Sequence, residues 1–207
     1  MEIQKREDLL WCGLTLTLTI LVRGLMLGLL APLATGDSVR DLYAAWMVLE
    51  GKTPCRDFWW QYGPIMPFYY AFWFLLGGIH LISFQMGLDG IYVAIALAAF
   101  WTLRLFVPPP AAFLTSLAYL SFDYNWNFNH IGSIPFLLLS IFFLWKFFAS
   151  SRVRWCYLGT LAMVGVTLVK ISVGPPFFLA FLASILFFNL ILYLRKEKKF
   201  SDLGWKH

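Results

Sequence analysis

Seven apolar segments constrain this chain of 207 residues more than any other feature of its sequence. They are separated by polar stretches or by joints rich in proline and glycine, and they cover residues 9–30, 65–84, 90–107, 111–122, 131–148, 155–169 and 176–194. A helix needs about 20 mainly apolar residues to cross a bilayer, and in lipid its backbone must satisfy its own hydrogen bonds. We therefore predict an all-α fold, a polytopic membrane helical bundle, with residues 1–207 forming a single transmembrane domain.

The composition excludes an ordinary soluble domain. Hydrophobic residues make up 60% of the chain and charged residues only 13%, and the mean hydropathy is +0.72. The net charge of +5 does not indicate nucleic acid as a partner, because the basic residues cluster at the ends of apolar segments, as in loops that face anionic lipid. The expected surroundings are membrane lipid.

The first apolar segment and the cysteines indicate how the chain begins and whether it is cross-linked. Segment 9–30 is longer than the apolar core of a signal peptide and no clean cleavage site follows it, so we interpret it as an uncleaved first span. The three cysteines show no ligand spacing, which indicates neither a disulfide framework nor a zinc site.

The basic residues also predict an orientation. They form three groups: Lys5 and Arg6; Lys146, Arg152 and Arg154; and Arg195, Lys196, Lys198 and Lys199. The positive-inside tendency puts all three groups, and both termini, in the cytoplasm. An even number of crossings must then separate successive groups, so one of the five segments between the first two should not cross. We choose 65–84 as a juxtamembrane or re-entrant helix, because it is rich in Pro, Gly and Tyr; the short segment 111–122 is the alternative.

In that topology the polar, aromatic loop 36–64 lies outside. It holds four of the chain's 11 carboxylates, Asp37, Asp41, Glu50 and Asp57. The segments around it are expected to lie in the membrane, where charge is expensive and is seldom kept without a partner or a purpose. The loop is therefore where chemistry is expected.

The order of residues in this loop carries a family resemblance. The loop contains Asp37, Tyr43-Ala44-Ala45, Gly51-x-x-Pro54, Arg56-Asp57-Phe58 and Tyr62-Gly63-Pro64. It resembles the first external loop of the GT-C superfamily of polyprenyl-phosphate-sugar-dependent glycosyltransferases, closest to bacterial relatives of protein mannosyltransferases and of the aminoarabinose transferase. The segment 159–174, which contains Lys170, is similar to the family's small-residue helix that ends in a Lys. Cys55 departs from the family pattern, which has Tyr at that position.

The resemblance implies a membrane glycosyltransferase, or the N-terminal fragment of one. Such an enzyme moves a sugar from a polyprenyl-phosphate donor to an acceptor hydroxyl on the outer face of the membrane, here the bacterial inner membrane. Family members usually continue for several more spans and an external domain. A missing C-terminal half, or a partner that supplies it, is therefore expected, and a truncated chain would be inactive.

This chemistry needs a base for the acceptor and cations for the departing phosphate. The resemblance aligns Asp37 with the family's catalytic Asp, although Asp37 also fits a helix cap. Asp41, one helical turn away, is the second candidate base and also fits a solvated helix residue.

Several side chains are candidates for holding the donor phosphate. Lys170 ends an apolar run, where an ammonium either meets an anion or extends to the headgroups. Arg56 and Lys52 are loop cations that also fit ordinary surface charge, and Tyr62 belongs to the matched motif. Arg23 lies toward the outer end of the first span and fits either headgroup contact or the donor phosphate.

A second polar stretch, 123–130, lies on the same outer side. Asn127 and His130 are candidates for hydrogen bonds to sugar hydroxyls, and Tyr124, Trp126 and Phe128 fit either sugar stacking or an interfacial belt. Asp123 with His130 is too small a set to indicate a divalent metal, and no cofactor is predicted. The alternative to an enzyme is a non-enzymatic polytopic protein, such as a transporter fragment or a flippase or assembly accessory.

Overall fold

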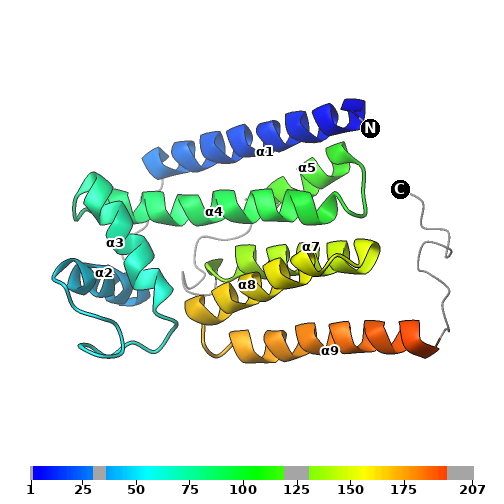
Figure 1. Ribbon diagram of the computed structural model, residues 1–207. Coiled ribbons are helices and arrows are strands. Elements are labelled where there is room, and N and C mark those ends of the chain that lie inside the picture. Colours follow the sequence, from blue (N-terminus) through cyan, green and yellow to red (C-terminus); the bar gives the residue numbers. More distant parts are fainter. Residues whose placement is uncertain (1, 30–35, 119–130, 195–207) are drawn as a thin grey trace.

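The computed structural model describes residues 2–29, 36–118 and 131–194, and in these ranges the predicted all-α fold is confirmed (Figure 1). The helices are α1 (Glu2–Leu29), α2 (Gly36–Leu49), α3 (Ile65–Gly77), α4 (Leu81–Leu103), α5 (Pro109–Ala118), α7 (Ile134–Ser150), α8 (Val153–Val169) and α9 (Gly174–Leu194). The third basic group, at residues 195–199, lies outside the described residues.

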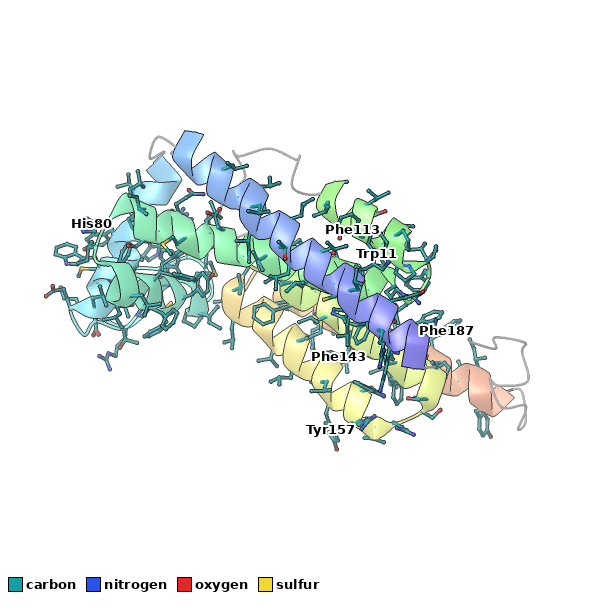
Figure 2. All side chains as sticks on the ribbon, turned by 90° about the horizontal axis from the view of Figure 1, so that it is seen from above. Trp11, His80, Phe113, Phe143, Tyr157 and Phe187 are labelled. Atoms are coloured by element: carbon teal, nitrogen blue, oxygen red, sulfur yellow. The ribbon has the colours of Figure 1, made fainter. Side chains whose placement is uncertain are left out.

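Five long helices lie side by side in the order α1, α4, α7, α8 and α9 (Figure 1). The short helix α5 packs on both α1 and α4, where Trp11 lies against Phe113 with ring centroids 5.2 Å apart (Figure 2). The helices α2 and α3 and residues 50–64 gather at one end of the bundle, which we call the loop end. The opposite end, where α1 begins and α4 ends, is the basic end.

The loop end is attached to the bundle by aromatic packing of α3 on α4. The ring of Tyr70 lies 4.4 Å from that of Phe84, and the Tyr69 hydroxyl donates a hydrogen bond of 2.7 Å to the Gly87 carbonyl. At Gly87 and Gly90 a Cβ atom would press into the rings of Tyr69, Tyr70 and Trp73. The two glycines therefore let α3 approach α4 closely, and this contact is part of the main core.

The boundaries predicted for 65–84 and 90–107 were misplaced. Helix α3 ends at Gly77, the chain turns at Gly78 with φ +82°, and α4 already begins at Leu81. A positive φ suits glycine, which explains the break. The segment predicted at 90–107 begins just after Asp89, and a charge inside a membrane helix is unfavourable unless it has a partner. Asp89 lies inside α4 because it has a partner.

That partner is Arg23 of α1. The Arg23 Nε donates a hydrogen bond of 2.7 Å to Asp89 Oδ1, and the Arg23 Nη2 lies 2.5 Å from the same oxygen. Gln85 donates a second hydrogen bond to this oxygen, and the guanidinium stacks 3.9 Å from the ring centroid of Tyr92. Arg23 is only 3% exposed. It therefore joins α1 to α4 instead of extending to headgroups.

A second ion pair joins the same two helices at the basic end. The Nε of Arg104, the residue that caps the end of α4, donates to Asp8 Oδ1 of α1 at 2.6 Å. From Asp8 to Arg23 and from Asp89 to Arg104 the spacing is 15 residues in each case. Equal spacing in opposite chain directions fits antiparallel helices of equal rise. The two pairs thus set one register. At the loop end α1 supplies the cation and α4 the carboxylate, and at the basic end these roles are reversed.

The apolar surface supports a membrane protein. Gln4–Leu25 in α1, Leu81–Leu103 and Gly174–Ile191 in α9 are long and apolar enough to cross a bilayer. Most side chains of the stretches in α1 and α9 are not buried, and large apolar residues such as Leu186 and Phe187 face outward (Figure 2). Helices α7 and α8 have 17 residues each, which is near the lower limit for a span, whereas α5 has 10.

The first prediction concerns the buried ion pair. Replacing Asp89 by Leu leaves the Arg23 guanidinium buried without its carboxylate, so the free energy of unfolding should fall by about 3–5 kcal/mol. The double variant Arg23→Met with Asp89→Leu removes both charges and should recover most of that loss. Thermal unfolding in a neutral detergent measures both effects. The control is Asp8→Leu, which breaks the more exposed pair and should cost less; equal losses at the two pairs would contradict this reading.

Candidate functional site

Residues 50–64, which carry the later part of the family-like motif, pack against the end of α8. Helix α2 ends at Leu49, and Gly51, with φ +79°, reverses the chain. The loop then returns so that the Gly63 amide donates a hydrogen bond of 3.1 Å to the Val169 carbonyl. A Cβ atom at Gly63 would overlap the Leu168 carbonyl. Only a glycine fits this approach, and it places the neighbouring Tyr62 beside the residue that follows α8, Lys170.

Four side chains meet there, and we call them the Arg40 cluster: Arg40, Asp41, Tyr62 and Lys170. The Arg40 Nε and Nη2 atoms donate to Asp41 Oδ1 at 3.1 and 3.0 Å. The Arg40 Nη1 donates to the Tyr62 hydroxyl at 3.4 Å. The Arg40 Cζ lies 4.8 Å and the Lys170 Nζ 5.9 Å from the centroid of the Tyr62 ring. The Tyr62 ring therefore lies near one cation from α2 and one from the turn that follows α8.

Burial makes the electrostatics of this cluster strong. Asp41 is 1% exposed and Lys170 is 6% exposed, whereas the Arg40 side chain keeps 23% of its surface open. Burial lowers the pKa of the Lys170 ammonium, because removal from water disfavours the charged form. The four side chains together carry two cations and one carboxylate. An anion that reached both cations would offset their desolvation, so the cluster is suited to bind a phosphate.

Three of the predicted site residues, Asp41, Tyr62 and Lys170, come together in this cluster. Asp37 lies in the first turn of α2, one turn before Asp41, and its side chain lies outside the described part. Asn127 and His130 belong to residues 119–130, which are outside the described residues.

The other two predicted cations, Arg56 and Lys52, have exposed side chains on the returning loop. Arg56 pairs with its neighbour Asp57 at 2.7 Å. Hydrogen bonds from the Arg56 side chain and from the Thr53 amide lower the pKa of Asp57 to about 2, and the same pair raises the pKa of Arg56. Arg56 and Lys52 are therefore solvent-exposed loop charges.

Arg40 belongs to the cluster but is not among the residues predicted from the sequence. It adjoins Asp41 in α2, and a helical position beside an acidic residue gives no sign of facing the bundle. The sequence offered only an indirect signal for Arg40. A buried carboxylate such as Asp41 needs a cation as its partner, and Arg40 is adjacent to it in sequence. Among the described residues no three His, Cys, Asp or Glu side chains gather as a metal site.

Comparison with protein-family models, curated proteins and solved structures finds no match to this chain. The function is therefore argued from the chemistry of the Arg40 cluster.

The second prediction tests how the loop is seated on α8. Gly63→Ala forces a methyl group against the Leu168 carbonyl, so the free energy of unfolding should fall by about 1–3 kcal/mol. Gly13→Ala is the matched control, because a Cβ atom there meets nothing within 4 Å and alanine favours a helix. Thermal unfolding of both variants in detergent provides the measurement. A Gly63→Ala protein as stable as the Gly13→Ala protein would show that the loop is not held against α8.

Proposed function

We propose that the chain is a membrane glycosyltransferase of the GT-C type, or the N-terminal part of one. It moves a sugar from a polyprenyl-phosphate donor to an acceptor hydroxyl on the outer face of the membrane. The observation that carries the proposal is the Arg40 cluster, in which two cations flank one tyrosine ring directly beside the helix that carries Asp37.

The cations of the cluster have the task of holding the donor phosphate. Arg40 is suited to it because a planar guanidinium binds phosphate oxygens through paired hydrogen bonds. Lys170 adds a compact charge from the turn that follows α8. As the sugar leaves the phosphate, negative charge grows on the phosphate oxygens, and two fixed cations stabilise this charge most in a partly dehydrated site.

The two carboxylates then have different roles. Asp41 is buried and accepts both Arg40 hydrogen bonds at one oxygen, so it positions Arg40. Asp37, one turn earlier, is the general base. It takes the proton of the acceptor hydroxyl while the acceptor oxygen bonds to the anomeric carbon. The bond from that carbon to the phosphate oxygen breaks, and polyprenyl phosphate leaves with its electron pair.

The proposed setting is an inner membrane of bacterial type, with both termini cytoplasmic and the loop end outside. The arrangement of charge supports it. Among the described residues, six basic ones lie at the basic end: Lys5, Arg6, Arg104, Lys146, Arg152 and Arg154. Residues 36–64, which hold Asp37, Asp41, Glu50 and Asp57, lie with the Arg40 cluster at the opposite end of the bundle (Figure 1). Basic residues prefer the cytoplasmic side.

A non-enzymatic transporter fragment or flippase or assembly accessory is the second candidate. The Arg23–Asp89 pair favours it most, since transporters keep ionisable groups at depth in the membrane. That pair also has a complete structural explanation, because it fixes α1 against α4. The measurement that separates the two candidates is sugar transfer itself.

The third prediction tests the base. Asp37→Asn keeps the size of the side chain but cannot take a proton, so sugar transfer from a polyprenyl-phosphate donor should fall by about 10²–10⁴-fold with the unfolding temperature unchanged. Asp57→Asn, a change of the exposed loop carboxylate, is the matched control and should keep transfer. Asp41→Asn should instead impair donor binding. Transfer that survives Asp37→Asn and vanishes in Asp41→Asn would move the base one turn along α2.

The fourth prediction tests the phosphate site. Polyprenyl phosphate should raise the unfolding temperature of the wild-type chain, because a ligand stabilises the state that binds it. Lys170→Met keeps the apolar stem and removes the charge, so donor affinity should fall by about tenfold. Lys52→Met, an exposed loop cation, is the control. Equal stabilisation of wild type and Lys170→Met by the lipid would remove Lys170 from the site.

A further inference from the structure

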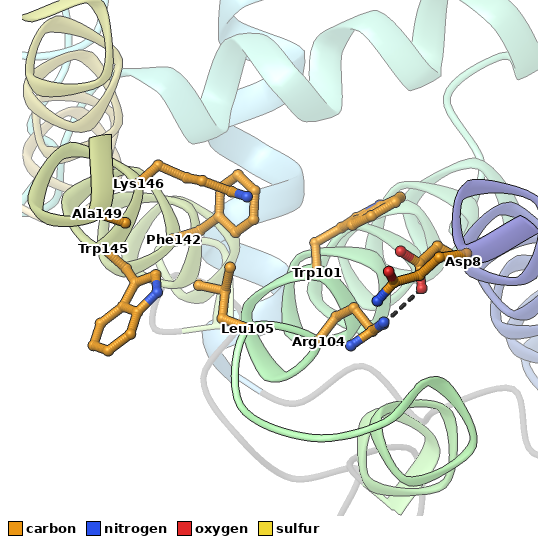
Figure 3. A pocket seen from close by; sticks show the side chains of 9 residues that line it. Asp8, Trp101, Arg104, Leu105, Phe142, Trp145, Lys146 and Ala149 are labelled. Carbon is orange, nitrogen blue, oxygen red and sulfur yellow. Dashed lines mark hydrogen bonds and ion pairs between the residues drawn. The ribbon is translucent and has the colours of Figure 1, made fainter. Parts of the chain in front are cut away.

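The basic end contains a pocket that the proposed function does not use. It lies between α1, α4 and α7 and has a volume of about 280 Å³ (Figure 3). Its charged lining residues are Asp8, Arg104 and Lys146, and Trp101 and Trp145 form aromatic walls. Gln4 and Ala149 at its rim are exposed, so the pocket is accessible from outside the bundle.

The charges in this pocket have separate roles. Asp8 is engaged by Arg104 at 2.6 Å, and Arg104 also donates to the Val107 carbonyl at 3.1 Å. This pair is therefore tied to the structure of α1 and α4. Lys146 extends from α7 over the Phe142 ring, with its Nζ 5.5 Å from the ring centroid, toward the wall that Trp101 forms (Figure 3). The three charged groups leave one net positive charge in a half-buried, mostly apolar pocket.

The surroundings match the headgroup region of a bilayer. The pocket lies where α1 begins and where α4 and α7 end, which is the depth at which membrane helices meet water. Tryptophan rings are enriched at that depth, because they combine an apolar body with a polar N–H. Basic pockets between membrane helices bind the phosphate headgroups of anionic lipids.

We propose that this pocket binds the headgroup of an anionic phospholipid. The ammonium of Lys146 contacts the lipid phosphate, the Asp8–Arg104 pair forms the polar floor, and the acyl chains lie along the apolar surfaces of α1 and α7. The lipid thereby joins α7 to the α1–α4 pair. This site is at the opposite end of the bundle from the Arg40 cluster, and it does not depend on the proposed sugar transfer.

The experiment is a lipid titration of the chain purified in a neutral detergent, at constant ionic strength, with thermal unfolding as the readout. The three ligands are phosphatidylglycerol, phosphatidylcholine with the same acyl chains, and inorganic phosphate. The variants are Lys146→Gln, which removes the charge, Lys146→Arg, which keeps it, and Arg152→Gln. Arg152 is exposed at the same end and does not line the pocket. Arg152→Gln is therefore the control, because it removes one positive charge without changing the pocket.

The expected result is that phosphatidylglycerol raises the unfolding temperature of wild type, Lys146→Arg and Arg152→Gln alike. Lys146→Gln should need about tenfold more of this lipid for half of the effect, as expected for one charge-assisted contact. Equal responses of Lys146→Gln and Arg152→Gln would overturn the site. An equal response to phosphatidylcholine would overturn the role of the anionic charge. The same shift with inorganic phosphate alone would replace the lipid by a free phosphate as the ligand.

Discussion

The antiparallel register of α1 and α4, set by two ion pairs, is the constraint on which the rest of the structure depends. Arg23 meets Asp89 near the loop end and Asp8 meets Arg104 near the basic end, with 15 residues between the two contacts on each helix. That spacing corresponds to about 22 Å of helix. A shift of one helix along the other would separate both pairs at once, and in an apolar environment separated charges are strongly unfavourable. Apolar packing alone tolerates such shifts, because a leucine surface offers many equivalent contacts.

This register also decides where the candidate site forms. Helix α2 follows α1 in the chain and α3 precedes α4, so the end of one helix and the start of the other anchor both sides of the loop end. The aromatic contact between Tyr70 and Phe84 then fixes α3 against α4. Arg40 and Tyr62 are both carried by this anchored unit, where they share a hydrogen bond.

The fold was largely predictable because apolar length carries most of the information in a membrane chain. The segments predicted at 131–148, 155–169 and 176–194 correspond to α7, α8 and α9 within a few residues. The predicted start of α4 was wrong, because the segment was begun after Asp89 and the distant partner that makes this charge tolerable inside the helix is not visible in local sequence. The site shows the same limit. Asp41, Tyr62 and Lys170, each predicted separately as a site residue, lie in one cluster, whereas Arg40 was not predicted and Arg56 was, because only tertiary packing decides which cation turns inward.

The Arg40 cluster joins two parts of the structure that are fixed in different ways. Arg40 and Tyr62 belong to the loop end, whereas Lys170 sits in the turn between α8 and α9, where its carbonyl accepts hydrogen bonds of 3.1 and 3.0 Å from the Val173 and Gly174 amides. The Gly63–Val169 contact is the backbone link between them. The two cations repel each other, although each is attracted to the Tyr62 ring and Arg40 is paired with Asp41, and an anion that contacts both cations offsets that repulsion. A phosphate that contacts both cations would therefore bind more tightly when the two parts are docked, and by linkage it would favour their docking. In that case a bound phosphate completes the site that holds it.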